Sequence, residues 1–153
     1  MLISLLLGSA TLFVSMTIEV MIVVITIRYL LKIMNKADGT TINFGFDTYV
    51  ISITLLILFA GHLMQIAIWA GLFIYLGEFE DFLTAFYHST VNFSSLGYGD
   101  IVMSERWRLL GALEASNGVL MFGLSAGTLL AIMTNLFRRR MDSKAFQNTK
   151  LNG

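Results

Sequence analysis

Three stretches of this chain are long and apolar enough to cross a lipid bilayer as helices. They cover residues 1–34, 49–77 and 106–138, and each exceeds the roughly 20 apolar residues that a spanning helix needs. The chain is 56% hydrophobic and only 13% charged, which leaves too little polar surface to cover a soluble domain of this size. The sequence therefore predicts an all-α membrane protein with three transmembrane helices.

A fourth apolar segment, residues 82–94, is too short to span. It follows a cluster of acidic residues and precedes a turn that contains Gly97 and Gly99. About a dozen apolar residues fit a re-entrant helix, which enters the membrane without crossing it. Non-helical backbone at membrane depth is tolerated only where protein buries it or where it lines a water-filled path. We therefore expect residues 96–99 to line such a path.

The distribution of charge predicts the orientation in the membrane. Of ten Lys and Arg residues, three lie near the end of the first helix, five follow the third, and only Arg106 and Arg108 lie on the other side. The positive-inside rule then places the N-terminus outside. Residues 35–48 become a cytoplasmic loop and residues 141–153 a short cytoplasmic tail, which we expect to be disordered from residue 147 onward. Five acids face outward around the pore loop, which suits a cation pathway: Glu78, Glu80, Asp81, Asp100 and Glu105.

Several classes of function are unsupported by the sequence. The absence of cysteine removes disulfides, thiolate metal sites and thiol nucleophiles. We find no metal-ligand cluster, no nucleophile beside a base and no phosphate-binding loop, and so expect neither an enzyme nor an organic cofactor, and no nucleic-acid partner. The first helix carries only Arg28, whereas a voltage sensor needs several regularly spaced arginines.

The segment Ser95 to Asp100 reads S-L-G-Y-G-D and closely resembles the potassium-channel signature T-V-G-Y-G-D. Residues 85–89 (A-F-Y-H-S) are similar to the pore helix of that family. Trp107 and Gly118 stand where two-transmembrane potassium channels carry a tryptophan and a hinge glycine on the inner helix.

The resemblance covers residues 49–140 and implies a potassium-channel pore domain. Its parts are an outer helix over 49–77, a pore helix over 82–94, a filter over 95–100 and an inner helix over 106–138. Residues 1–34 are then an additional N-terminal transmembrane helix. One chain carries one filter motif, so the resemblance implies a homotetramer around a central pore.

The resemblance also implies roles for individual residues in passive, selective conduction of K⁺. The filter is formed by Ser95, Leu96, Gly97, Tyr98 and Gly99. The carbonyls of the first four, with the Ser95 hydroxyl, are expected to coordinate K⁺ ions, and Tyr98 is expected to hold the filter open against the pore helices.

Four further residues are expected to support the filter: Asp100, His88, Ser94 and Val91. We hypothesise that His88 pairs with Asp100 and makes inactivation sensitive to pH. Ser94 and Ser95 replace threonines of the family pattern, and Leu96 replaces valine or isoleucine. These departures leave a weakly selective cation channel open as an alternative. A non-conducting regulatory membrane subunit is a further alternative.

Three glycines of the third helix are candidates for a gating hinge: Gly118, Gly123 and Gly127. Gly123 and Gly127 also form a G-x-x-x-G pattern, which permits close helix packing. Further along the same helix, residues at intervals of four are candidates for the lining of the inner pore: Thr128, Ile132 and Leu136.

Four polar residues interrupt the predicted spans: Glu19, His62, Gln65 and Glu114. Such residues are costly in a membrane and face the bundle interior. From a helical rise of about 1.5 Å per residue, matching depths pair Gln65 with Glu114 and Glu19 with His62. The residues are interpreted either as structural interhelical hydrogen bonds or as a proton or ligand sensor.

The remaining expectations concern the surroundings of the protein. Arg138, Arg139 and Arg140 form a juxtamembrane basic cluster, which is expected either to bind anionic lipid or to act only as a topology signal. The lipid bilayer is the expected environment, and a bacterial inner membrane the expected location.

Overall fold

The computed structural model describes residues 2–36 and 44–151, with side chains over 2–34 and 44–141. Within these ranges the elements are α1 (Leu2–Lys36), α2 (Phe44–Tyr75), α3 (Phe82–Phe93) and α4 (Arg108–Leu151). Three segments are long and apolar enough to cross a membrane: Leu2–Met34, Phe44–Tyr75 and Arg108–Met141. The predicted all-α membrane fold is therefore confirmed.

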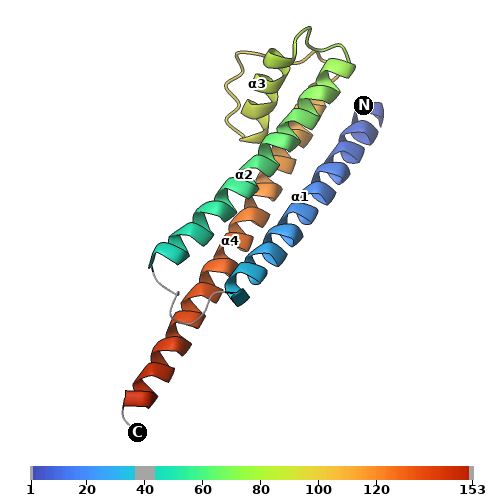
Figure 1. Ribbon diagram of the computed structural model, residues 1–153. Coiled ribbons are helices and arrows are strands. Elements are labelled where there is room, and N and C mark those ends of the chain that lie inside the picture. The colour runs from blue at the N-terminus through green and yellow to red at the C-terminus, as the bar shows by residue number, and fades with distance from the viewer. Residues whose placement is uncertain (1, 37–43, 152–153) are drawn as a thin grey trace.

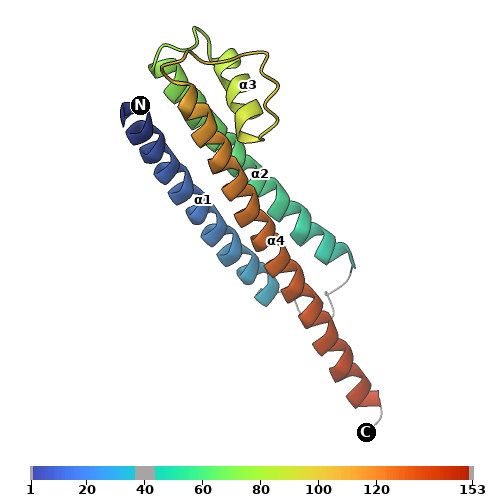
Figure 2. The ribbon, with the colours of Figure 1, turned by 180° about the vertical axis from the view of Figure 1, so that it is seen from behind.

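The three long helices lie side by side, and α3 lies at the end of the bundle that also holds the N-terminus (Figures 1 and 2). α1 and α4 run in the same direction and α2 runs against them. α1 packs on α2 and α4, while α3 packs on the same two helices nearer one end. α3 thus lies against α2 and α4 near one end of the bundle, and α1 lies against the same two helices from another side.

Most of the residues of α1 that are buried before its last turns are polar, whereas its exposed face is apolar. Ser4, Ser15, Glu19 and Thr26 are at most 2% exposed and recur at helical spacing. The opposite side carries large exposed apolar residues such as Phe13, at 71%. This inversion of the soluble pattern is expected of a helix whose outer surface meets lipid and whose polar residues face other helices.

Local sequence signals end α2 and begin α3. Gly77 adopts φ +75°, its amide donates to the Ile74 carbonyl, and the Glu78 amide donates to the Phe73 carbonyl. This pair of bonds is a Schellman motif, which glycine favours because it has no Cβ. Asp81 then caps α3 by accepting a hydrogen bond from the Thr84 amide at 2.9 Å.

Two helices are longer than expected. α2 begins at Phe44 rather than at residue 49, since Phe46 packs on the buried cluster at that end of the bundle and Asp47 places an acid in the first turn. α4 continues to Leu151, so the expectation of disorder was wrong up to that residue. Residues 141–151 contain neither glycine nor proline to end the helix. The predicted loop at residues 37–43 lies outside the described residues.

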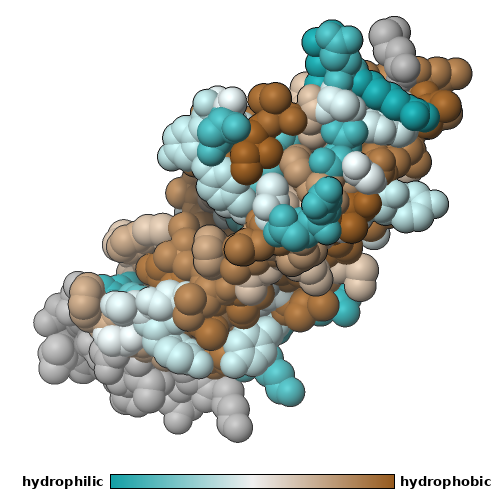
Figure 3. Space-filling model, turned by 90° about the horizontal axis from the view of Figure 1, so that it is seen from above, coloured by the Kyte–Doolittle hydropathy of each residue, from teal (hydrophilic) through white to brown (hydrophobic). Residues whose placement is uncertain are grey.

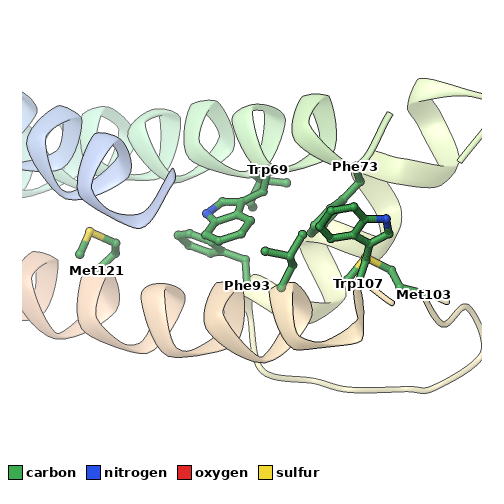
Figure 4. Packing of buried hydrophobic residues seen from close by; sticks show 8 residues of the cluster. Trp69, Phe73, Phe93, Met103, Trp107 and Met121 are labelled. Atoms are coloured by element: carbon green, nitrogen blue, oxygen red, sulfur yellow. The ribbon is translucent and has the colours of Figure 1, made fainter. Parts of the chain in front are cut away.

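Aromatic side chains build the core beneath α3. Trp69 and Phe73 of α2 and Phe93 of α3 are fully buried, and they pack with Trp107 and Met103, which precede α4 (Figure 4). Figure 3, which looks onto the end that carries α3, shows apolar side chains interrupted by polar ones. The core therefore holds the end of α3 against α2 and against the segment that precedes α4.

Replacing Trp69 with Ala is expected to lower the free energy of unfolding by about 3 kcal/mol, because it opens a cavity between α2, α3 and α4. Reversible unfolding in mixed detergent micelles measures this loss. Leu56→Ala on the same helix is the matched control, since Leu56 is 64% exposed and its loss should cost less than about 1 kcal/mol. Equal losses in the two variants would contradict the assigned core.

Candidate ion-conduction site

The loop after α3 alternates in backbone handedness. Ser95, Gly97 and Gly99 have φ angles of 59°, 60° and 70°, so every second residue adopts the left-handed region. Among the described residues, Ser95 is the one residue other than glycine that has a positive φ. A non-glycine residue in this region costs about 1–3 kcal/mol and persists only where its surroundings hold it.

Hydrogen bonds turn the start of this loop back toward α3. The Ser95 amide donates to the Asn92 carbonyl at 2.8 Å, and the amides of Leu96 and Gly97 donate to the Val91 carbonyl at 3.0 and 3.4 Å. In a trans peptide the N–H and the C=O point in opposite directions. Since the amides of residues 96 and 97 face α3, the carbonyls of Ser95 and Leu96 face away from it.

The loop lies on an open side of the chain. Leu96 is 57% exposed and Tyr98 is 66% exposed, although Phe93 at the end of α3 is fully buried. A pocket of about 510 Å³ is lined by α3, by residues of the loop between 97 and 105, and by the start of α4. His88, Asn92 and Gly97 contribute to its wall, and Glu105 and Arg108 add charged groups.

Asp100 pairs with Tyr87, not with His88 as predicted. The Tyr87 hydroxyl donates to Asp100 Oδ2 at 2.7 Å, and this bond lowers the pKa of Asp100. His88 instead uses both ring nitrogens elsewhere. Asn92 Nδ2 donates to Nε2 at 2.8 Å, so Nδ1 carries the hydrogen and donates to the Ile101 carbonyl at 3.0 Å. Burial lowers the pKa of His88, which favours this neutral form.

Sequence reasoning thus missed Tyr87 and Asn92. Both lie on α3 within one turn of His88, and both have hydrogen-bonding side chains that could have marked them as partners. Which of two adjacent side chains reaches Asp100 depends on the path of the loop, because neighbouring residues on a helix point about 100° apart.

The other two predicted supports act through the backbone and through packing. Val91 is 6% exposed, and its carbonyl receives the loop amides. The Ser94 hydroxyl donates to the Thr90 carbonyl at 2.7 Å, which closes the last turn of α3. Both residues therefore stabilise the junction between α3 and the loop.

Of the three hinge candidates, only Gly118 is closely packed. A Cβ built on Gly118 would lie 1.8 Å from the carbonyl oxygen of Phe93, whereas a Cβ on Gly123 or Gly127 would have no neighbour within 4 Å in the described part of the chain. The glycine therefore lets α4 pass directly against the end of α3. α4 is a continuous helix through all three positions, and their role as a hinge stays a prediction.

The candidates for the pore lining were wrong for this chain. Thr128, Ile132 and Leu136 are 6%, 7% and 4% exposed, and the last two pack against Leu30 and Met34 of α1. That side of α4 faces α1 and α2. Leu130, at 66% exposed, lies on another side of the helix.

The four intramembrane polar residues are all buried, and one of the two predicted pairings is confirmed. His62 Nε2 lies 3.6 Å from Glu19 Oε1. The pairing of Gln65 with Glu114 was wrong: Gln65 Nε2 donates to Glu19 Oε2 at 2.7 Å, and Glu114 Oε1 accepts from the Ser89 hydroxyl. The depth argument omitted α3, which supplies Ser89.

The basic cluster at the end of the third span has partners within the chain. Arg140 Nη2 forms an ion pair with Asp47 Oδ2 at 2.5 Å, and Arg139 donates to the Met34 carbonyl at 2.8 Å. These contacts fasten α4 to the start of α2 and to the end of α1. Arg138 is exposed.

The comparison with known families agrees with this geometry. A family model described as "Ion channel" matches residues 52–135, which include most of α2, all of α3, the loop and most of the spanning part of α4. α1 lies outside the match. No curated protein and no solved structure matches the chain.

Replacing Gly118 with Ala is expected to destabilise the protein by about 2–3 kcal/mol, because the new methyl group would overlap the Phe93 carbonyl. Thermal unfolding in detergent measures the effect. Gly123→Ala is the matched control on the same helix, and it should be neutral or slightly stabilising because nothing lies within 4 Å. A stable Gly118→Ala variant would contradict the close contact.

Tyr87→Phe is expected to raise the pKa of Asp100, because it removes the hydrogen bond that stabilises the carboxylate. The stabilisation from this bond is present above the ordinary pKa of aspartate and is lost as the pH falls through the lowered value. Carbon-13 NMR of the aspartate carboxyl groups follows the titration. Asp81, whose pKa is lowered by hydrogen bonding to Thr84, is the internal control and should not change. An unchanged Asp100 titration would contradict the pairing.

Proposed function

The chain belongs to the ion channel family, and on that basis we propose that it is a subunit of a homotetrameric, potassium-selective channel. Four copies close one central pore, and K⁺ flows through it down its electrochemical gradient. No covalent bond is made or broken in this process.

The alternating backbone of residues 95–99 carries the proposal. Left-handed residues at every second position turn successive carbonyls toward the same side, and the amide bonds to Val91 direct the first two away from α3. A row of carbonyl oxygens on one side of a loop is the arrangement that replaces the hydration shell of a cation.

In this mechanism the carbonyls of Ser95, Leu96, Gly97 and Tyr98 coordinate dehydrated K⁺, and the Ser95 hydroxyl adds a ring of oxygens at the inner end. Gly99 lets the backbone leave the filter toward Asp100. Adjacent sites allow conduction because ions that bind in neighbouring rings repel one another and move on.

Assembly of four chains accounts for the open side of the loop. Leu96 and Tyr98 are largely exposed in one chain, although exposed apolar groups at membrane depth beside a water-filled pore would be unfavourable. Neighbouring copies cover them in the tetramer, where Tyr98 packs against pore helices.

The same proposal fixes the orientation and the lipid contacts. The N-terminus and the acidic loop face outward, and the end of α4 faces the cytoplasm, as charge predicts. The bacterial inner membrane is the proposed location. The exposed Arg138 faces anionic headgroups together with Arg139 and Arg140, whose protein contacts hold them near the membrane surface.

A flux assay tests the proposal. Purified protein is placed in liposomes with K⁺ inside and Na⁺ outside. K⁺ efflux creates a potential that draws protons in through an added proton ionophore, and this proton uptake is measured. We expect K⁺ flux that Ba²⁺ blocks and that replacement of K⁺ by Na⁺ abolishes. Equal Na⁺ flux would favour the weakly selective alternative suggested by Ser94, Ser95 and Leu96. No flux would favour a non-conducting regulatory subunit.

Gly97→Ala is expected to lower K⁺ flux at least about tenfold, because a Cβ strains a backbone with φ +60°. Gly71→Ala in α2 is the matched control, since nothing lies within 4 Å of its Cβ position and its φ is not positive. Unchanged flux in the Gly97 variant would remove the assignment of this loop as the filter.

A further inference from the structure

A buried acid of α1 lies at the centre of a hydrogen-bond network that joins three helices. Glu19 is 0% exposed. Its Oε2 accepts from Gln65 Nε2 of α2 at 2.7 Å, and its Oε1 accepts from Ser125 Oγ of α4 at 2.9 Å. The network thus includes one polar side chain from each of the three long helices.

His62 extends the network in a defined direction. Its Nε2 lies 3.0 Å from Ser125 Oγ and 3.6 Å from Glu19 Oε1. Because the Ser125 hydroxyl gives its one hydrogen to Glu19, its oxygen must accept the hydrogen from His62 Nε2. The bonds therefore run from His62 through Ser125 to Glu19.

The ring of the same histidine also contacts the inner helix and the end of α3. Its ring packs edge-on against Phe122 of α4, with centroids 4.9 Å apart, and lies 5.9 Å from the ring of Phe93. Phe93 is the last residue of α3, and its carbonyl is the group against which Gly118 packs. A change at His62 thus acts on the inner helix and on the base of the filter loop.

We propose that Glu19, Ser125 and His62 form a proton-binding site through which α1, which lies outside the family match, controls conduction by the pore domain. The proposal rests on the proposed channel function. The ligand is a proton, bound at the imidazole beside the carboxylate.

Glu19 and His62 are the two ionisable groups that the neighbouring elements bring together here. Among the described residues, α1 contributes Glu19, α2 contributes His62 and the neutral Gln65, α4 contributes Ser125 and Phe122, and α3 contributes only the ring of Phe93. The nearest acid along α4 is Glu114, which lies eleven residues earlier and bonds Ser89 of α3.

The sign of the effect follows from the charges. A neutral His62 donates one hydrogen bond toward the carboxylate, whereas a protonated His62 also attracts it electrostatically in a region of low dielectric. Acidification therefore strengthens the attraction between α1 and α2 and both hydrogen bonds of Ser125, which lies between the two charges. Through Ser125 it holds the inner helix more firmly in place. We expect conduction to fall as the pH is lowered.

The experiment compares K⁺ flux and thermal stability between about pH 7.5 and about pH 5.5, the range in which histidine titrates. In the wild-type protein, flux should fall at least about fivefold on acidification, and the midpoint of thermal unfolding should rise. Glu19→Gln, His62→Gln and Ser125→Ala should each reduce both pH dependences. Ser15→Ala is the matched control, because Ser15 lies on the same buried face of α1 and its hydroxyl has no hydrogen-bond partner among the described residues.

The outcomes separate this proposal from the proposed function. A pH-dependent unfolding midpoint that His62→Gln abolishes, in a protein without K⁺ flux, would support the proton site and reject the channel. K⁺ flux with a pH dependence that is unchanged in both His62→Gln and Ser125→Ala would support the channel and overturn the proton site. Loss of the pH dependence in Ser15→Ala as well would also overturn it, since a general packing defect would then suffice.

Discussion

The need to satisfy backbone polar groups at membrane depth governs this structure. α3 ends inside the bundle, where its last carbonyls have no helical partner. The amides of Ser95, Leu96 and Gly97 fill that role by donating to Asn92 and Val91. The same bonds direct the carbonyls of Ser95 and Leu96 away from α3. The termination of the short helix and the direction of these two carbonyls are therefore consequences of one constraint.

The sequence allowed the spans, the short helix and the glycine-rich loop to be predicted, because apolar length and positive-φ residues are local signals. α3 was expected over residues 82–94 and covers Phe82–Phe93. The partners of polar side chains could not be predicted in the same way. Depth placed Glu19 correctly beside His62, but Gln65 reaches Glu19 rather than Glu114. Depth along a helix says nothing about its rotation, and rotation decides which neighbour a side chain meets.

Gly118 illustrates a second limit. A glycine in the middle of a membrane helix permits either bending or close approach, and sequence spacing does not distinguish the two. In the structure, the Phe93 carbonyl occupies the space that a side chain would need. The pore-lining prediction failed for a related reason. An interval of four residues identifies one face of a helix but not what that face contacts, and Ile132 and Leu136 pack on α1.

The parallel arrangement of α1 and α4 has a consequence for biosynthesis. Contacts such as Ser4 with Arg106 and Glu19 with Ser125 join residues more than 100 positions apart, so α1 is synthesised well before α4. Its buried carboxylate would be costly if it remained alone in lipid. Gln65 and His62 lie on the antiparallel α2, which is synthesised before α4. A hairpin of α1 and α2 therefore gives Glu19 its first partners. When α4 packs on this hairpin, Ser125 donates to Glu19 and the carboxylate becomes fully buried.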